Sequence, residues 1–187
     1  MKKYMTDSQK ESQECYSHEN ISLKLASYND IFSSFDPRPY SERSLSVDFL
    51  GETRRASIDK PSGGIELRLM LPKRLRTLEI EKIIQNRLKN HFEKHTKKIK
   101  NQHTKIIRNG ALFTVSGIIV MLLASFILFR SPENNLFVNF LIILFEPAGW
   151  FFFWEGLDQI VFESKKVRPD LEFYEKMANS DIIFLSC

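Results

Sequence analysis

Two long apolar stretches near the C-terminal end limit what this 187-residue chain can fold into. The first runs from Gly110 to Phe129 and carries no charged side chain. A helix of that length covers about 30 Å, which is the thickness of the hydrocarbon core of a bilayer. The rest of the chain is too small to bury such a helix in a soluble core, so we expect residues 110–129 to form a transmembrane helix.

The second apolar stretch covers residues 136–162 and is most hydrophobic as far as Trp154. Between the two stretches lies the short segment 130–135, which is polar and contains proline and asparagine. Such a linker is typical of a tight turn between antiparallel helices. We therefore predict a second transmembrane helix at 136–162, joined to the first by an external turn.

Basic residues flank this predicted hairpin on both sides. Lys105 and Arg108 end a basic run before the first span, and residues 165–168 supply three more basic side chains after the second. The turn carries only Arg130, which Glu133 balances. The positive-inside rule then predicts that both termini are cytoplasmic, in the cell membrane or an inner membrane.

Two tryptophans and a concentration of positive charge mark the expected cytoplasmic boundary. Trp150 and Trp154 lie where the second span should leave the bilayer, as interfacial tryptophans do. Between Lys73 and Arg108 there are twelve Lys or Arg and three Glu, a local net charge of +9 in a chain whose total is +4. We expect this segment to face anionic lipid head groups and not nucleic acid, because the basic run ends where the apolar run begins.

The predicted fold class is a membrane protein with a transmembrane hairpin inserted in a small cytoplasmic α+β domain. Residues 1–20 are polar and are expected to be a disordered tail. Residues 21–74 should form the α+β domain, with alternating patterns that predict strands at 21–26 and 65–71 and a helix that opens at Ser41. Residues 163–187 should return to this domain as a helix, with Pro169 near its start, and a third strand at 181–186.

Residues 75–109 predict a basic amphipathic helix that continues into the first span. Apolar residues recur at steps of three and four from Ile80 through Ile84, Leu88 and Phe92, with Lys and Arg between them. No Pro or Gly interrupts the pattern before Gly110. The apolar stripe of this stalk needs a partner, which can be the small domain, the returning C-terminal segment or another copy of the chain.

Glu146 is the strongest candidate for a functional residue. It lies near the middle of the second span, where an ionisable group costs about 2.5 kcal/mol or more unless it is protonated, paired or hydrated. Pro147 removes a backbone donor beside it, which predicts a kink near 146–147, and Asn139 lies two turns away on the same side. These three residues predict either an ion or proton pathway or a polar contact between helices; a helix break at this point is the plain alternative.

A second pattern predicts helix packing. Gly110, Thr114, Gly117 and Ala124 lie on one stripe of the first span, and small residues allow helices to approach closely. We expect this stripe to pack on the second span or on a neighbouring copy.

Other candidates for chemistry are weaker. His91 and His95 lie one helical turn apart, but no third ligand is near them in the sequence, so a solvated helix face is the better interpretation and no metal is expected. The segment 36–43 joins charges to two prolines before a predicted helix, where Asp36 or Ser41 is expected to cap that helix. The sequence predicts no catalytic residue and no cofactor.

Three classes of function remain, in order of support. The first is a non-enzymatic, membrane-anchored protein that self-associates or binds a partner through its cytoplasmic domain and stalk. The second is an oligomeric pore or ion pathway that uses Glu146. The third is a membrane-surface enzyme built around residues 36–43.

Overall fold

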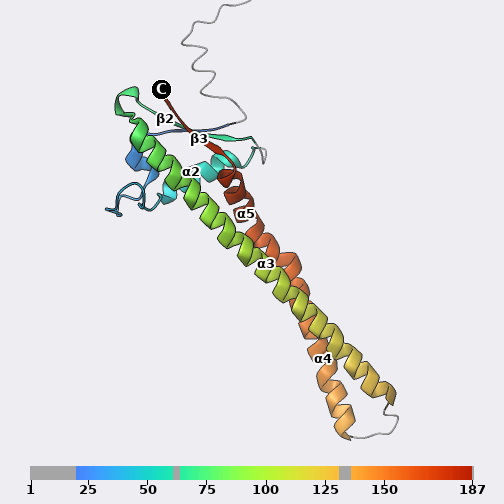
Figure 1. Cartoon of the computed structure of the whole chain (residues 1–187). Helices are drawn as coiled ribbons and strands as arrows, with labels where there is room; N and C mark the ends of the chain where they lie inside the picture. The colour runs from blue at the N-terminus through green and yellow to red at the C-terminus, as the bar shows by residue number, and fades with distance from the viewer. Residues whose placement is uncertain (1–19, 61–63, 131–135, 187) are drawn as a thin grey trace, which may run out of the picture. The chain divides into compact units, whose positions relative to one another are not determined.

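The computed structural model describes residues 20–60, 64–130 and 136–186. The chain divides into two compact units, one built from residues up to Lys97 together with those from Leu171 onward, and the other from Lys98–Asp170. Figure 1 shows the course of the chain through both, and each is described by itself below. The predicted tail at 1–20 and turn at 130–135 fall outside the described residues, apart from Asn20 and Arg130.

The first unit contains a sheet of three strands in the order β1-β2-β3, all parallel. The strands are β1 (Ile21–Lys24), β2 (Glu66–Leu71) and β3 (Asp181–Ser186). Leu67 of the central strand pairs with Ile21 on one side and Ile182 on the other. The three-stranded sheet with its helices was expected, and because parallel neighbours require crossover connections, the unit follows a β–α–β pattern.

Helix α2 (Val47–Ser57) forms the first crossover, between β1 and β2. It begins six residues later than the start predicted at Ser41, because the cap is Ser46, whose hydroxyl accepts a hydrogen bond from the amide of Asp48 at 3.2 Å. Short 3₁₀ turns, η1 (Tyr28–Ile31) and η2 (Lys73–Leu75), follow β1 and β2.

The second crossover, from β2 to β3, contains all the remaining helices. Helix α3 (Leu78–Arg130) is continuous for 53 residues, which confirms the predicted long helix. Helix α4 (Leu136–Asp158) follows, then a π-helical turn, η3 (Gln159–Glu163), and α5 (Ser164–Ala178). The polypeptide therefore enters and leaves the helical hairpin through two neighbouring strands of one sheet.

One face of the sheet and the helices around it form the core of the first unit. Ile84, Leu88 and Phe92 of α3 are fully buried, which confirms the apolar stripe read from their spacing. They join Leu67 and Leu69 of β2 in one cluster. Burying a leucine or phenylalanine side chain stabilises a fold by about 1.5–3 kcal/mol, so these contacts account for much of the cohesion of a small domain.

Two predictions about prolines need correction. Pro169 was expected near a helix start, but it lies inside α5, because the preceding π-helical turn carries helical backbone into that segment. Pro147 lies inside α4, and helical structure continues on both sides of it. A helix break at Glu146 is therefore wrong, and the kink near 146–147 stays a prediction.

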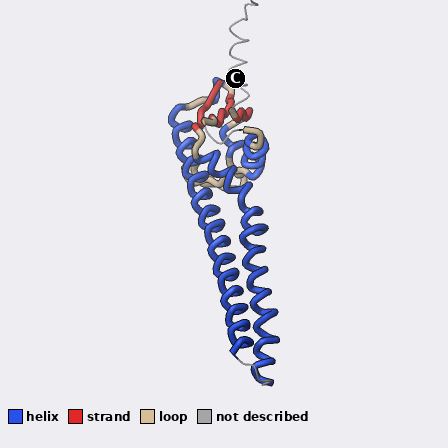
Figure 2. Tube along the Cα trace, turned by 90° about the vertical axis from the view of Figure 1, so that its right-hand side faces the viewer, coloured by secondary structure: helices blue, strands red, loops and turns tan. Residues whose placement is uncertain are grey.

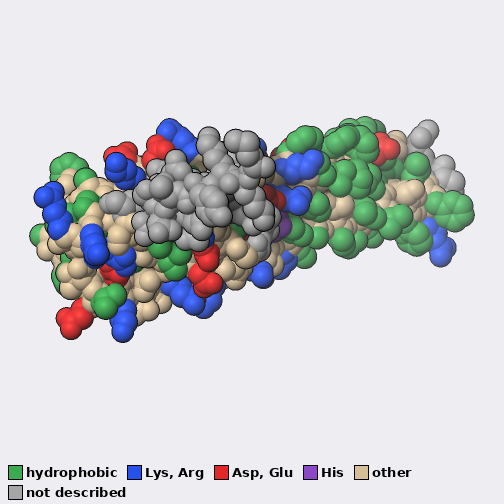
Figure 3. All heavy atoms as spheres, turned by 90° about the horizontal axis from the view of Figure 1, so that it is seen from above, with side chains coloured by type: hydrophobic (Ala, Val, Ile, Leu, Met, Phe, Trp, Pro, Cys, Tyr) green, Lys and Arg blue, Asp and Glu red, His purple; other side chains and the backbone are tan. Residues whose placement is uncertain are grey.

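The second unit is a two-helix hairpin. Residues of α3 beyond Lys98 run antiparallel to α4, and Figure 2 shows the two helices side by side along the hairpin. Both helices are long and apolar enough to cross a membrane. Their most apolar windows are only 11% and 6% buried, whereas the core helix of a soluble protein would be mostly buried. Figure 3 shows hydrophobic side chains over much of the visible face of the elongated part of the molecule.

Candidate functional site

Close backbone packing holds the two helices of the hairpin together. Gly110 of α3 lies against Gly156 of α4, and Gly117 lies against Gly149. A Cβ atom added at Gly117 would lie 2.5 Å from the backbone nitrogen of Phe153 and 2.6 Å from the carbonyl oxygen of Gly149. Only glycine fits at such a contact, because the obstructing atoms are backbone and cannot rotate away.

The two glycine pairs share one spacing. Seven residues separate Gly110 from Gly117 on α3, and seven separate Gly149 from Gly156 on α4. Seven residues are close to two helical turns, so each helix presents its two glycines on one side. The contact is a seam in which backbone meets backbone and side chains such as Met121 and Thr114 pack around the glycines, so dispersion at close range stabilises the pair.

The remaining members of the predicted packing stripe lie at or beside this seam. Ala124 is 3% exposed, and Thr114 is half-buried with its hydroxyl donating to the carbonyl of Gly110 at 2.9 Å. Gly149 and Gly156 were not identified from the sequence. Their seven-residue spacing, repeated in both apolar stretches, is the signal that could have found them.

Glu146 and Asn139 lie outside the seam. Both side chains are exposed on α4, as is Pro147. Helical geometry places Glu146 about 60° around α4 from Gly149, on the flank of the glycine face. Within one hairpin, the structure therefore brings neither polar side chain against α3.

The predicted interface residues are also exposed. Trp150 and Trp154 are 55% and 53% exposed, and their rings meet edge to face at 5.7 Å. Lys105 and Arg108 are exposed on α3, toward the polar end of the hairpin. An aromatic pair next to a change from apolar to basic surface is typical of a membrane boundary.

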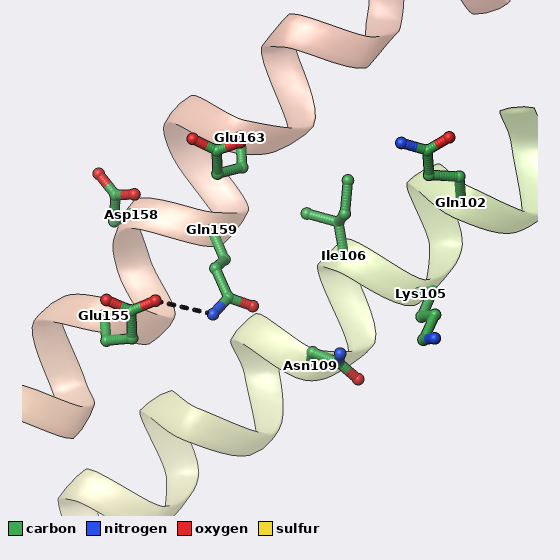
Figure 4. Close-up of a pocket in the computed structure, with 8 residues that line it drawn as sticks. All are labelled: Gln102, Lys105, Ile106, Asn109, Glu155, Asp158, Gln159 and Glu163. Carbon is green, nitrogen blue, oxygen red and sulfur yellow. Dashed lines mark hydrogen bonds between the residues drawn. The ribbon is translucent and has the colours of Figure 1, made fainter.

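A pocket of about 450 Å³ opens between α3 and α4–η3 at this polar end. Figure 4 shows the Gln159 side chain pointing toward α3 and donating to Glu155 at 3.0 Å, while Lys105 points away from α4. The lining residues are Gln102, Lys105, Ile106, Asn109, Glu155, Asp158, Gln159 and Glu163. The carboxylates come from one side and do not converge on a point, so they do not form a ligand set.

The two histidines proposed as a weak metal candidate lie in the first unit. The imidazoles of His91 and His95 stack at 4.2 Å, and Tyr174 of α5 stacks on His95 at 5.1 Å. His91 is half-buried, and its Nε2 atom has no hydrogen-bond partner among the described residues. The solvated helix face expected for this pair is therefore wrong, because α5 packs over it.

No group of three or more His, Cys, Asp or Glu side chains with metal-binding geometry occurs within residues 20–60, 64–130 and 136–186. The packing of the two histidines changes the pKa of His91. Burial lowers the pKa of His91 to about 4, and the positive charges of His95, Arg87 and Lys94 contribute in the same direction.

The segment 36–43 is tied to its own loop. Asp36 accepts three hydrogen bonds from the Arg38 guanidinium and one from the amide of Ser44 at 2.8 Å, and these hold the pKa of its carboxyl well below the usual range. Arg43 donates to the carbonyl of Ser33. Asp36 therefore closes this loop. The prediction that Asp36 caps the following helix is wrong.

A buried polar cluster that the sequence did not reveal lies at the carboxyl end of the sheet. Glu81, 5% exposed, accepts two hydrogen bonds from Arg76 and one from the hydroxyl of Tyr28. Arg76 also donates to Ser186 at the end of β3. The cluster joins the start of α3 to the turn that follows β1 and to the end of β3. Its donors and acceptors are paired with one another, which indicates a structural role.

Comparison with protein-family models, with curated proteins and with solved structures found no match for this chain.

Alanine at the glycine seam is expected to destabilise the hairpin. Alanine normally favours a helix over glycine by about 1 kcal/mol, but at Gly117 or Gly156 its methyl group would force the backbones apart and cost about 1–3 kcal/mol. We expect Gly117→Ala and Gly156→Ala to unfold at lower SDS concentration in mixed micelles, followed by circular dichroism. Gly51→Ala is the control, because its Cβ would meet no atom within 4 Å and should not lower the midpoint.

The His91 environment predicts a loss of stability in acid. Its folded pKa lies below the unfolded value of about 6.5, so the unfolded chain binds the proton more readily, and stability falls as the pH drops from about 6.5 toward 4. The melting temperature of the purified protein should fall over this range. His91→Phe should reduce that fall, and an equal fall in both proteins would contradict the assignment.

Proposed function

We propose that this protein is a membrane-anchored, non-enzymatic protein whose hairpin holds a small domain and basic stalk at the cytoplasmic face, where they bind a partner or another copy. The apolar surface of the hairpin is the observation that carries this proposal. Ile119, Leu122 and Phe126 on α3 and Phe140 and Ile143 on α4 are each more than half exposed. Soluble monomers rarely expose apolar patches beyond a few hundred Å², and insertion in a bilayer removes this cost.

The sheet supports an arrangement with both flanks of the hairpin on one side of the membrane. β2 precedes the hairpin and β3 follows it, and the two strands are hydrogen-bonded neighbours. A chain that leaves and re-enters the same sheet crosses a bilayer an even number of times. The basic residues beside the hairpin favour the cytoplasm for that side.

Binding through the small domain is supported by its size and its sheet edges. Among the described residues, β1 and β3 each pair with a strand on one side only. An open strand edge offers backbone donors and acceptors to another chain. A small core also gains stability from association, because little apolar surface is buried by the domain itself.

The polar clusters of the first unit support a non-enzymatic role. The charges at Asp36, Arg38 and Glu81 are paired within the fold, and each has neighbouring backbone or hydroxyl partners. Groups held in this way fix local structure and are not poised to bind a reacting molecule.

Extraction and mass measurement test the proposal. Membranes from cells that express the chain should retain it in alkaline carbonate and release it only in detergent, because the hairpin is held by hydrophobic transfer. The detergent-solubilised particle should then have the mass of a multimer or of a complex with a fixed partner. Release by carbonate would contradict membrane anchoring, and a strictly monomeric particle without a partner would contradict the binding role.

A further inference from the structure

Asn139 and Glu146 form a polar stripe on the outer surface of α4. Both side chains are exposed, and seven residues separate them, so they lie two turns apart on the same side of the helix. Ile143 lies between them and is 70% exposed. We call the surface formed by Asn139, Ile143 and Glu146 the polar stripe.

The glycine seam fixes the depth of Glu146 in the hairpin. Because Gly149 lies against Gly117 in an antiparallel pair, Glu146, three residues before Gly149, lies level with Val120 on α3. Val120 is in the middle of the uncharged stretch from Gly110 to Phe129. In an inserted hairpin, Glu146 is therefore near the centre of the hydrocarbon.

The hairpin itself does not satisfy these polar groups. Residues 110–129 of α3 carry no charge, and the hydroxyl of Thr114 is used by the carbonyl of its own helix at Gly110. In the part of the chain that the structure describes, neither the Glu146 nor the Asn139 side chain has a hydrogen-bond partner. Hydrocarbon offers none, so each group gains from a partner outside the hairpin.

A second copy of the same chain offers matching chemistry. Copies inserted in one orientation place identical residues at identical depth, so a two-fold axis along the membrane normal brings Glu146 to Glu146 and Asn139 to Asn139. A carboxamide both donates and accepts hydrogen bonds, and so does a protonated carboxyl group. Each polar residue is therefore complementary to itself, whereas a partner with a basic side chain would satisfy Glu146 and leave Asn139 without a matching group.

We propose that the polar stripe pairs two copies of this chain within the membrane, through hydrogen bonds between the Glu146 carboxyl groups and between the Asn139 carboxamides. This inference rests on the proposed membrane insertion. It adds a contact in the bilayer to the association proposed for the cytoplasmic domain.

Cysteine crosslinking tests the geometry. In the full chain with Cys15→Ser and Cys187→Ser, Ile143→Cys should form a disulfide-linked dimer under mild oxidation in bilayers at low protein-to-lipid ratio. Leu144→Cys is the matched control, because it is 51% exposed but lies about 100° further around α4. We expect at least about fivefold less dimer from the control, since its thiols face away from the axis. Equal crosslinking at the two positions would overturn the proposal.

Leucine and glutamine substitutions test the chemistry. In the Ile143→Cys chain, Asn139→Leu with Glu146→Leu should lower the association constant about tenfold, the effect expected for losing interhelical hydrogen bonds. Glu146→Gln should keep the pairing, because its carboxamide also donates and accepts. The leucine variant is more apolar and inserts at least as readily, so loss of dimer cannot be assigned to failed insertion. Undiminished crosslinking in that variant would overturn the proposal, as would a crosslink to a protein of different mass.

Carbonate extraction of the same samples separates the two proposals. Chain retained in the membrane without an Ile143→Cys dimer contradicts pairing through the polar stripe and leaves the membrane anchor in place. Chain released by carbonate contradicts the anchor, and with it the pairing.

Discussion

β2 and β3 run parallel as neighbours, and everything from Pro72 to Ser180 must leave the sheet at one strand and return at the other. Parallel strands cannot be joined by a tight turn, because the chain has to travel back to the starting end of the sheet. In most β–α–β units a single helix forms this crossover connection. Here the connection also contains a helical hairpin, so the hydrogen bonds of β2 with β3 hold both ends of the hairpin to one small domain.

The inner and outer faces of the hairpin differ in the residues they carry. The glycine seam joins α3 to α4 through close backbone contacts, and the side chains of Thr114 and Met121 pack against its glycines. Other large apolar side chains of the hairpin, such as Leu122 and Phe140, are exposed. The polar stripe is exposed on the flank of this surface, outside the contact between α3 and α4.

The elements with strong periodicity were predictable from the sequence. The two apolar stretches at 110–129 and 136–162 predicted both helices of the hairpin. The spacing of Ile84, Leu88 and Phe92 predicted the continuous helix and its buried face. The third strand, at 181–186, was also located correctly. These predictions succeed because each depends on a pattern within one segment.

The features that depend on contacts between distant segments were not predictable. The residues within the three strands do not indicate that the strands pair in parallel. The residues around Glu81 likewise do not indicate that its carboxylate accepts hydrogen bonds from Arg76 and Tyr28. The half-burial of His91 depends on α5, which lies far along the chain. In the candidate site, the stripe on α3 was visible, but its glycine partners on α4 required knowledge of the antiparallel register.

A hairpin that crosses a membrane, as proposed, leaves the sheet on one side of it. Labelling of single thiols with a membrane-impermeant maleimide tests this most directly, in intact cells and in inside-out vesicles. Cys187, which directly follows β3, should react only in the vesicles when Cys15 is replaced by serine. Ser131→Cys, introduced between the two apolar helices of a chain lacking both native cysteines, should react only in the intact cells. Reaction of both thiols from the same side would contradict a hairpin that crosses the membrane.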